Sequence, residues 1–361
     1  MKICLIADAT SVHTIRWAEY FIAQGDEVHL ITYEPPGTNI LGINLHVISS
    51  LFQNLYISFI PRHIKIYFLI RKIKPDIIHA HFISKFGFHA AFLGIHPVVM
   101  SAWGDDILII PHWSKFLRYF TKLSLKRADK IYAVSEDIAK KIVSNFEISV
   151  KKVTVVPFGV NTELFRPGIF INRENNKIIV FSNRNFFKVY NIENLIKAIP
   201  KVVQKKKNIF FIIKGSGPLE DHLKKLAKSL NLRDDHIKFL GWSKYEDMPE
   251  YLHNSDIYVS TAISDGTPVS VLEAMACGKA CIVTDVGGVS EWIKNDINGL
   301  LIPPGQPDIL TEKIVELAEN LEKRKELGKE ARKTITLSGD WNKIMKWVRN
   351  DYENLMRSNE L

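Results

Sequence analysis

The sequence predicts an α/β protein with two Rossmann-like, doubly wound domains. The chain begins with an apolar run, Lys2–Ala7, followed by a polar loop, a helical stretch and a second apolar run, Glu27–Thr32. This strand–loop–helix–strand order is typical of a parallel sheet covered by helices. The order begins again at Lys177–Asn183, and a chain of 361 residues is long enough for two domains of ordinary size.

The composition is that of a water-soluble globular protein. Apolar residues make up 46% and charged residues 24%, and no apolar run reaches the 18 or so residues that a membrane-spanning helix needs. The chain enters a strand at once, so we expect no signal peptide. Cys4, Cys277 and Cys281 do not have the spacing of a disulfide framework or of a zinc site, which fits a cytoplasmic protein.

The formal charge of +9 is concentrated in the first half of the chain. Residues 1–167 hold 19 Lys and Arg against 13 Asp and Glu. Such a surplus occurs in proteins that bind nucleic acid or an anionic membrane face, and also where charge only keeps a protein soluble. The charge alone leaves these interpretations open.

The stretch Ser264–Trp292 is the most informative part of the chain. The β-branched run before it, Asp256–Thr261, is expected to be a buried strand. A helix follows, with Thr267 expected as its N-cap, Pro268 as its first helical residue and Gly278 at its end. A second strand and a pair of glycines complete an α/β crossover unit.

The start of this helix is predicted to bind an anion. The amides of Val269, Ser270 and Val271 are expected to be free of helical partners, and the helix macrodipole adds positive charge there. Asp265 before the helix and Glu273 inside it would accept hydrogen bonds from sugar hydroxyls. The pattern therefore indicates a ligand with a phosphate and a sugar, although an ordinary capped helix without a ligand would begin in the same way.

From Asp265 onwards, the sequence has an acidic residue, a glycine, six further residues and then Glu-Ala-Met-Ala-x-Gly, followed by a β run and by Gly-Gly and Glu. This order closely resembles the donor-site signature of retaining glycosyltransferases of family 4, which have the GT-B fold. The resemblance covers nearly the whole chain and is strongest over 128–305. It implies two Rossmann-like domains that face an interdomain cleft. It also implies retaining transfer from a nucleoside diphosphate sugar to a glycan or lipid-linked acceptor, in surface polysaccharide or lipopolysaccharide-type biosynthesis, with no metal and no cofactor.

The resemblance assigns roles to residues of the second domain. Asp265 would contact the transferred sugar, where the family usually has the longer Glu, and Glu273 would hold the ribose. Arg184 and Lys188 would clamp the two phosphates and stabilise the leaving group, although Lys188 comes one residue early for the family pattern. The other donor-binding residues that the resemblance implies are Gly215, Gly217, Gly266, Thr267, Pro268, Val269 and Ser270.

The acceptor side is assigned to the first domain, where the resemblance is weaker. His13 and Arg16 follow the first strand and would face the cleft, with a plain helix-entry role as the alternative for His13. His81 ends the strand at 75–82. Asp105 and Asp106 are expected to bind acceptor hydroxyls, Asp105 close to the reaction, but capping of the next helix explains both equally well.

Trp103 stands where many family members have a histidine near the transferred sugar. The resemblance implies that the departing phosphate accepts the acceptor's proton, so the reaction does not depend on that imidazole. His79 and His81 lie two residues apart and would face one side of a strand. No third ligand is evident, so no metal site is predicted.

Two basic, aromatic-rich stretches, Leu51–Lys74 and His112–Arg127, are expected to be helices. Their pattern suits amphipathic helices on an anionic membrane face, and core helices with a solvated basic end are an equal alternative. On the first interpretation the protein is cytoplasmic and binds peripherally to the inner face of the cytoplasmic membrane, near a lipid-linked acceptor.

We place the first domain at 1–167 and the second at 168–340, with a polar linker at 172–177. The region 308–335 is expected to form a long amphipathic helical segment. A C-terminal helix, 341–361, is expected to cross back to the first domain.

Two other functions remain open from the sequence. A nucleotide-sugar epimerase on the same fold would need carboxylates placed for elimination at the sugar. A basic membrane-binding or nucleic-acid-binding protein would explain the charge, but it leaves Arg184, Asp265 and Glu273 unexplained, so we expect no nucleic-acid partner.

Overall fold

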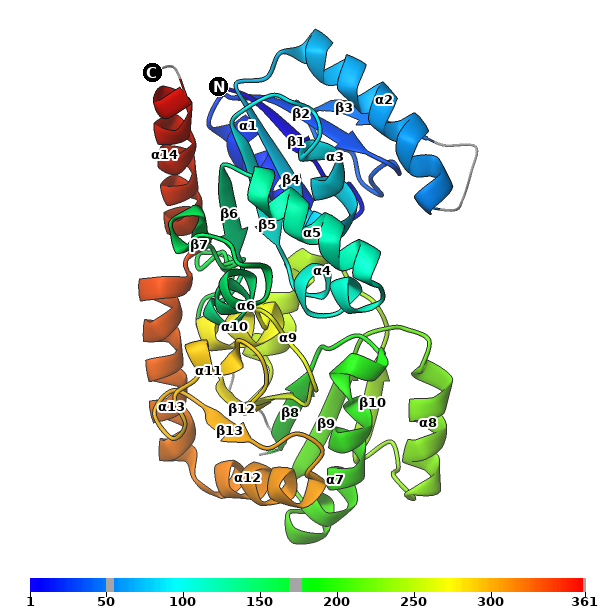
Figure 1. The fold of residues 1–361 in the computed structure, drawn as a ribbon. Helices are drawn as coiled ribbons and strands as arrows, with labels where there is room; N and C mark the ends of the chain where they lie inside the picture. The colour runs from blue at the N-terminus through cyan, green and yellow to red at the C-terminus, as the bar shows by residue number, and fades with distance from the viewer. Residues whose placement is uncertain (50–54, 169–176, 360–361) are drawn as a thin grey trace. The chain divides into compact units, whose positions relative to one another are not determined.

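The computed structural model describes residues 1–49, 55–168 and 177–359, and it divides into two compact units (Figure 1). The first unit comprises Met1–Pro157 with Lys343–Leu361, and the second comprises Phe158–Asn342. Each unit is built on a parallel sheet with helices on its faces, which confirms the predicted fold class. Most of the predicted linker and the start of the helix predicted at Leu51–Lys74 lie outside the described residues.

The first sheet has seven parallel strands in the order β3-β2-β1-β4-β5-β6-β7. The order reverses between β1 and β4, which pair in register with Cys4 opposite Ile78. In such sheets, ligands bind in the crevice outside the carboxyl ends of the strands at the point of reversal. The strands are β1 (Lys2–Ile6), β2 (Glu27–Thr32), β3 (Asn44–Val47), β4 (Ile77–His81), β5 (Val98–Ala102), β6 (Lys130–Ala133) and β7 (Val153–Val155).

The helices of the first unit lie on both faces of its sheet (Figure 1). Right-handed crossovers place α2, α3 and α5 on the face opposite α1. In agreement, the rings of Phe59 in α2 and His89 in α3 stack with their centroids 4.4 Å apart. The ring centroids of Phe88 in α3 and Phe120 in α5 are 6.0 Å apart. These helices are α1 (Val12–Ala23), α2 (Leu55–Ile73), α3 (Phe88–Ala90), α4 (Asp105–Leu108), α5 (Lys115–Arg127) and α6 (Glu136–Phe146), and a π-helical segment, η1 (Phe82–Gly87), follows β4.

The last helix, α14 (Trp341–Asn359), packs against the first sheet, as predicted for the C-terminal helix. Its Tyr352 stacks on Phe21 at 5.3 Å and hydrogen-bonds to the buried His79 of β4. Tyr132 of β6 donates to Asp351 at 2.7 Å. These buried polar contacts fix the rotation of α14 as well as its position.

The boundary between the units comes earlier than predicted, after Pro157 and not after Pro167. The segment that follows Pro157 packs on the second unit, because the Val160 amide bonds the Gly339 carbonyl and the Trp341 amide bonds the Val160 carbonyl. Phe165 is fully buried in the core of the second unit. Proline signals only the end of regular structure, so the sequence could not assign this segment to a core.

The second sheet has six parallel strands in the order β10-β9-β8-β11-β12-β13, with its reversal between β8 and β11. Its core holds large aliphatic and aromatic side chains from both faces, among them Phe211, Ile213 and Ile257. The strands are β8 (Ile178–Ser182), β9 (Ile209–Lys214), β10 (Ile237–Leu240), β11 (Ile257–Ser260), β12 (Ala280–Thr284) and β13 (Leu300–Ile302). The helices are α7 (Ile192–Lys205), α8 (Glu220–Ser229), α9 (Met248–His253), α10 (Val269–Ala276), α11 (Val289–Trp292), α12 (Pro307–Glu319) and α13 (Leu321–Thr334).

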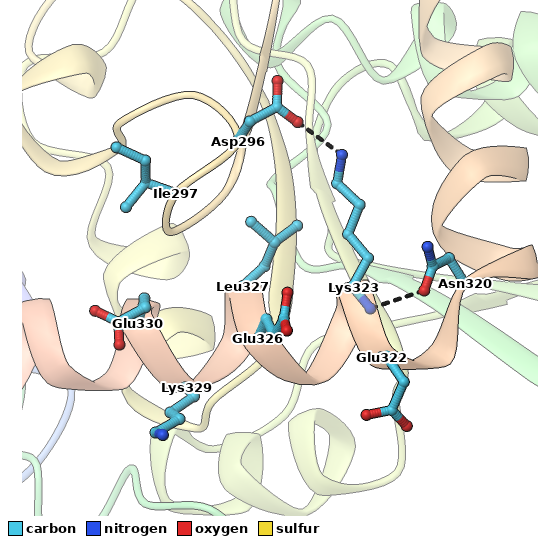
Figure 2. Close-up of a pocket in the computed structure, with 9 residues that line it drawn as sticks. All are labelled: Asp296, Ile297, Asn320, Glu322, Lys323, Glu326, Leu327, Lys329 and Glu330. Carbon is cyan, nitrogen blue, oxygen red and sulfur yellow. Dashed lines mark hydrogen bonds and ion pairs between the residues drawn. The ribbon is translucent and has the colours of Figure 1, made fainter.

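A hollow of about 500 Å³ lies beside α13 (Figure 2). Asp296 and Ile297, which form one side of it, come just before β13, so the hollow lies at the amino-terminal edge of the sheet. Ligands bind α/β sheets at the opposite, carboxyl edge. Its lining residues are Asp296, Ile297, Asn320, Glu322, Lys323, Glu326, Leu327, Lys329 and Glu330.

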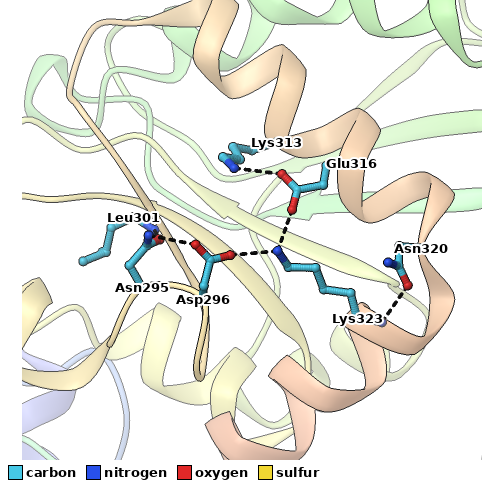
Figure 3. Close-up of polar contacts among 7 residues, drawn as sticks. All are labelled: Asn295, Asp296, Leu301, Lys313, Glu316, Asn320 and Lys323. Atoms are coloured by element: carbon cyan, nitrogen blue, oxygen red, sulfur yellow. Dashed lines mark hydrogen bonds and ion pairs between the residues drawn. The ribbon is translucent and has the colours of Figure 1, made fainter.

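The helical segment predicted at 308–335 consists of two helices, α12 and α13, which Asn320 separates. The Asn320 side chain accepts a hydrogen bond from the Lys323 amide and so caps α13. Lys323 also forms ion pairs with Asp296 at 2.7 Å and with Glu316 at 2.6 Å, and this network ties both helices to the turn before β13 (Figure 3).

Within the described residues, no helix is long and apolar enough to cross a membrane.

Candidate active site

The loops at the carboxyl edge of the second sheet bring the predicted donor residues together. Arg184 follows β8, the Gly215–Gly217 turn follows β9, and Asp265 lies between β11 and α10. Gly287 follows β12. The strand order reverses between β8 and β11, and a ligand of a doubly wound sheet is expected at the carboxyl ends of the strands beside such a reversal.

Arg184 is the centre of this cluster. Its Nη2 lies 2.6 Å from Asp265 Oδ2, and its Nη1 donates to Ser270 Oγ at 2.8 Å. The guanidinium carbon lies 4.1 Å from the ring centroid of Tyr190, and only 7% of Arg184 is exposed. Asp265 and Ser270, from the start of α10 and the loop before it, and Tyr190, from the loop that carries Arg184 itself, therefore hold the guanidinium in one place.

The Arg184–Asp265 ion pair shifts the pKa of both partners. Burial lowers the pKa of Arg184, but the Asp265 carboxylate, together with the Tyr258 and Tyr190 side chains, raises it by more in total. Burial also raises the pKa of Asp265, and Arg184 limits that rise. The guanidinium is therefore a fixed positive charge in a poorly solvated place, where it acts more strongly on an anion than an exposed arginine.

The glycines of two turns allow this close packing. At Gly215 a Cβ would lie 2.7 Å from the Arg184 carbonyl oxygen, and at Gly217 it would lie 2.8 Å from that of Phe186. At Gly287, which has a φ of 54°, a Cβ would lie 2.1 Å from the Asp265 carbonyl oxygen. A side chain at these positions would push the turn after β9 away from the Arg184 loop, or the turn after β12 away from the Asp265 loop.

Helix α10 begins one residue later than predicted, with Pro268 in the capping position and no side-chain cap. The prediction of Thr267 as N-cap is therefore wrong. The Val269 amide bonds the Thr267 carbonyl and the Val271 amide bonds the Pro268 carbonyl. The prediction of free amides is wrong for these two residues, because a tight turn at Pro268 uses them locally.

The other donor-side residues occupy the same edge with different exposure. Lys188 lies in a short 3-10 helix, Lys188–Tyr190, on the same loop as Arg184, and its side chain is exposed. Glu273 is buried in the second turn of α10. Gly266 and Thr267 lie in the loop between Asp265 and α10. The structure thus places one exposed and one buried cation on the same loop, next to two carboxylates.

The predicted acceptor residues of the first unit gather at the carboxyl edge of its sheet. His13 and Arg16 come from the first turns of α1, and His81 ends β4. The Trp103 ring lies 5.1 Å from the His81 ring and 5.9 Å from the His13 ring. The centroid of the Trp17 ring lies 5.2 Å from that of the His81 ring. Trp103 therefore joins the two histidines in one aromatic cluster.

Both histidines of this cluster are neutral at physiological pH. Burial, and then the nearby Arg16, lower the pKa of His13 to about 3. Burial, and then His13, lower the pKa of His81 to about 3. Neutral imidazoles in this place can exchange hydrogen bonds with a hydroxyl.

The described residues hold no group of three or more His, Cys, Asp or Glu side chains that could bind a metal ion.

The two aspartates after β5 have different environments. Asp106 is fully buried and accepts hydrogen bonds from the amides of Ile83, Trp103 and Gly104 at 2.8–3.0 Å. Burial raises its pKa to about 6, against the effect of these amides. This geometry supports the structural alternative for Asp106, which cannot reach an acceptor. Asp105 is exposed at the first position of α4.

Tyr190 was not predicted as a site residue, although it supports the Arg184 guanidinium. The only signal in the sequence was its position two residues after Lys188, on the loop that also carries Arg184. The contact itself, a guanidinium over an aromatic ring, is of the cation–π type and is seen only in the structure. The Tyr190 carbonyl also accepts a hydrogen bond from Thr261 at the end of β11.

Two family models match the chain. "Glycosyl transferases group 1" matches residues 168–334, and "Glycosyl transferase 4-like" matches residues 2–135. Among curated proteins, an uncharacterised glycosyltransferase of Methanocaldococcus jannaschii is 29% identical over 334 residues, which cover 91% of this chain and 90% of that protein. The UDP-Gal:α-D-GlcNAc-diphosphoundecaprenol α-1,3-galactosyltransferase of Escherichia coli is 25% identical over 71% of this chain and 70% of its own.

Solved structures share the fold over the whole chain. The structure of Anabaena HepE in complex with UDP superposes with a TM-score of 0.83 at 18% identity, over 98% of this chain and 100% of that one. A sucrose-phosphate synthase from Thermosynechococcus elongatus gives a TM-score of 0.84 at 17% identity, over 99% of both chains.

Proposed function

Because the chain belongs to the group 1 glycosyltransferases and has the GT-B fold, we propose that it transfers a sugar from a nucleoside diphosphate sugar to a glycan or lipid-linked acceptor, with retention of the anomeric configuration. The observation that carries the proposal is the buried Arg184 guanidinium, held beside Asp265 and Ser270 at the carboxyl edge of the second sheet. A fixed positive charge next to carboxylates suits a ligand that has both phosphates and sugar hydroxyls.

The donor residues divide the ligand between them. Arg184 and Lys188 bind the diphosphate and stabilise the negative charge that develops on it as the sugar leaves. Glu273 holds the ribose, and Asp265 accepts hydrogen bonds from the transferred sugar. Asp265 is already 2.6 Å from Arg184, so the diphosphate shares a cation with the carboxylate that orients the sugar. These cations supply the charge that the leaving group needs, and the proposal requires no metal.

Transfer with retention proceeds on one face of the sugar. The acceptor oxygen bonds to the anomeric carbon as the bond from that carbon to the phosphate oxygen breaks. The acceptor's proton passes to the departing phosphate oxygen. No enzymic base takes part, which is consistent with Trp103 in the place of the histidine that many related enzymes have. Neutral His13 and His81, together with the exposed Asp105, orient the acceptor.

We place the acceptor at a membrane because apolar side chains are exposed on one face of the first unit. Ile60, Ile64 and Phe68 form a stripe along α2, with 65%, 51% and 67% of each residue exposed. On α5 and just before it, Trp113, Phe116 and Tyr119 are more than half exposed. Helix α3 lies between α2 and α5, so both stripes belong to one face of the sheet.

Basic side chains flank these stripes. Arg71 and Lys72 follow the α2 stripe, and Lys115 and Arg118 lie within the α5 stripe. We name this surface the membrane face. Apolar side chains among cations fit the interface of an anionic bilayer. A lipid-linked acceptor for a surface polysaccharide would be presented there. The named activity of the E. coli relative, which acts on a diphosphoundecaprenol-linked sugar, supports this acceptor class.

The anomeric configuration of the released sugar tests the proposed reaction. The protein is incubated with α-linked nucleotide sugars and water as acceptor, and the product is followed by proton NMR before it equilibrates. We expect the α-anomer to appear first. First appearance of the β-anomer would show inversion and contradict the proposal.

A further inference from the structure

A cationic cluster surrounds Tyr33, just after β2. The Arg62 guanidinium carbon of α2 lies 4.0 Å from the centroid of the Tyr33 ring, and the Lys85 ammonium of η1 lies 5.2 Å from the same centroid. Tyr33 itself is 8% exposed. Two cations from separate elements therefore converge on one buried aromatic ring.

Two histidines hold the Tyr33 ring in place. The Tyr33 hydroxyl lies 2.6 Å from His89 Nε2, and His89 Nδ1 lies 3.3 Å from His63 Nδ1. Burial lowers the pKa of His89 to about 3 and also lowers that of His63, so both are neutral and can share hydrogen bonds along this chain. The stacked rings of Phe59, His63 and His89 leave Tyr33 little freedom to turn. The platform under the two cations is rigid before any ligand binds.

The positive charge of the cluster is poorly balanced by the protein. Arg62 donates to Ser58 Oγ at 2.8 Å, and its buried Nε has no hydrogen-bond acceptor in the described part of the chain. Lys85 lies 3.6 Å from Asp8, but Thr10 donates twice to that carboxylate at shorter distances. Both partners of the Lys85–Asp8 pair are about a third exposed, so the pair is weak.

The cluster stands where a ligand of the first sheet would bind. Tyr33 follows β2, Asp8 follows β1 and Lys85 follows β4, so all three lie at the carboxyl edge, beside the reversal between β1 and β4. We propose that Arg62 and Lys85, on the Tyr33 platform, form an anion subsite that binds a phosphate or diphosphate group of the acceptor. The role of this anion as part of the acceptor rests on the proposed function, whereas the anion site itself does not.

Calorimetric titration of the full-length protein with pyrophosphate tests the subsite. Saturating UDP is present, so that pyrophosphate cannot use the donor site. We expect binding that Arg62→Gln and Lys85→Gln each weaken about tenfold or more, because each removes a charge-assisted contact. Lys65→Gln is the matched control, since it removes an exposed cation one turn away on the same helix. It should change the affinity less than twofold.

Two further measurements identify the source of the anion and separate the two proposals. Farnesyl diphosphate replaces pyrophosphate in a second titration: much tighter binding assigns the subsite to a lipid-linked diphosphate, and equal binding assigns it to a soluble phosphate. UDP affinity, measured separately, should be the same in all variants. Failure of UDP and other nucleotides to bind would contradict the proposed function alone. Absence of pyrophosphate binding, or equal losses in Lys65→Gln and Arg62→Gln, would overturn the subsite.

Discussion

The Arg184 guanidinium and the Asp265 carboxylate form an ion pair of 2.6 Å with both side chains about nine-tenths buried. A buried ion pair is weak evidence for stability by itself, because the unfavourable free energy of removing both charges from water offsets much of their electrostatic attraction. The position of the Arg184–Asp265 pair at the carboxyl edge of the second sheet, where glycine-containing turns pack against both loops, supports the proposed donor site instead. The carboxylate holds the guanidinium where a diphosphate can bind it.

Replacement of Asp265 should destabilise the second unit strongly. Asp265→Ala leaves a buried guanidinium without its counter-charge, and we expect the free energy of unfolding to fall by about 3–5 kcal/mol. Denaturant unfolding measures the loss. Asp235→Ala breaks the exposed Arg233–Asp235 pair and should leave stability nearly unchanged. Equal effects of the two substitutions would show that burial of the Arg184 pair has no energetic importance.

Replacement of Arg184 by lysine should weaken nucleotide binding although it keeps the charge. Lysine cannot make the paired contacts of a guanidinium or stack on Tyr190 in the same way. We expect the affinity for a nucleoside diphosphate to fall by roughly tenfold to a hundredfold, which corresponds to a charge-assisted hydrogen bond of about 1.5–3 kcal/mol. Calorimetry measures the change, with Arg233→Lys as the exposed control. Unchanged affinity in Arg184→Lys would remove this residue from the site.

Tyr190 should act on the donor through Arg184. Tyr190→Ala removes the ring below the guanidinium, and we expect the KM for the donor to rise by roughly threefold to thirtyfold, as for a cation–π contact of about 0.5–2 kcal/mol. Tyr190→Phe keeps the ring and should behave as the native protein. A loss of kcat with unchanged KM, or equal losses in both variants, would assign Tyr190 another role.

Stability should fall as the pH drops from about 6.5 towards 3. His81 has a folded-state pKa of about 3, below its unfolded value of about 6.5, so over this range the unfolded chain binds a proton that the folded chain does not. Between pH 6.5 and pH 5, the shifted pKa of His81 lowers the free energy of unfolding by about 1.5–2 kcal/mol. We expect His81→Phe to reduce the measured loss by that amount. The control His112→Phe, at an exposed position, should keep the native loss, and an unchanged loss in His81→Phe would contradict the burial argument.

The membrane face should account for binding to anionic lipid. Phe68→Ser removes an exposed ring from it, and we expect binding to anionic liposomes at low salt to fall about tenfold or more, since burial of such a side chain contributes about 1.5–3 kcal/mol. Co-sedimentation measures the fraction bound. Trp242→Ser removes a ring that is 75% exposed on the second unit and should have little effect. A protein that ignores these liposomes would contradict the membrane part of the proposal.

The sequence predicted both sheets, and it predicted that the proposed donor residues follow strands of the second domain, because strand order and local motifs are encoded in short stretches of chain. Arg184, Asp265 and Ser270 were each predicted from their own loops, and the structure brings them together. The contact of Arg184 with Tyr190 could not be predicted, because it depends on the path of the loop that follows β8.

The errors have the same physical origin. The turn at Pro268 uses the amides of Val269 and Val271, and the choice between this turn and a regular helix start depends on tertiary packing. From the sequence, Asp106 could equally well bind the acceptor or cap the next helix. Its three hydrogen bonds from backbone amides of two segments, which favour a structural role, are known only from the structure. The Tyr33 cluster joins residues 33, 62, 85 and 89, which no sequence motif connects.

Thermal unfolding with a panel of nucleoside diphosphates and nucleotide sugars, without added metal, tests the donor site most directly. A ligand that binds only the folded state at a hundredfold excess over its Kd adds about 2.7 kcal/mol, which raises Tm by several degrees. We expect at least one nucleotide to stabilise the native protein and the control Arg233→Ala, but neither Arg184→Ala nor Glu273→Ala. No stabilisation by any nucleotide, or stabilisation that survives in Arg184→Ala, would contradict the account.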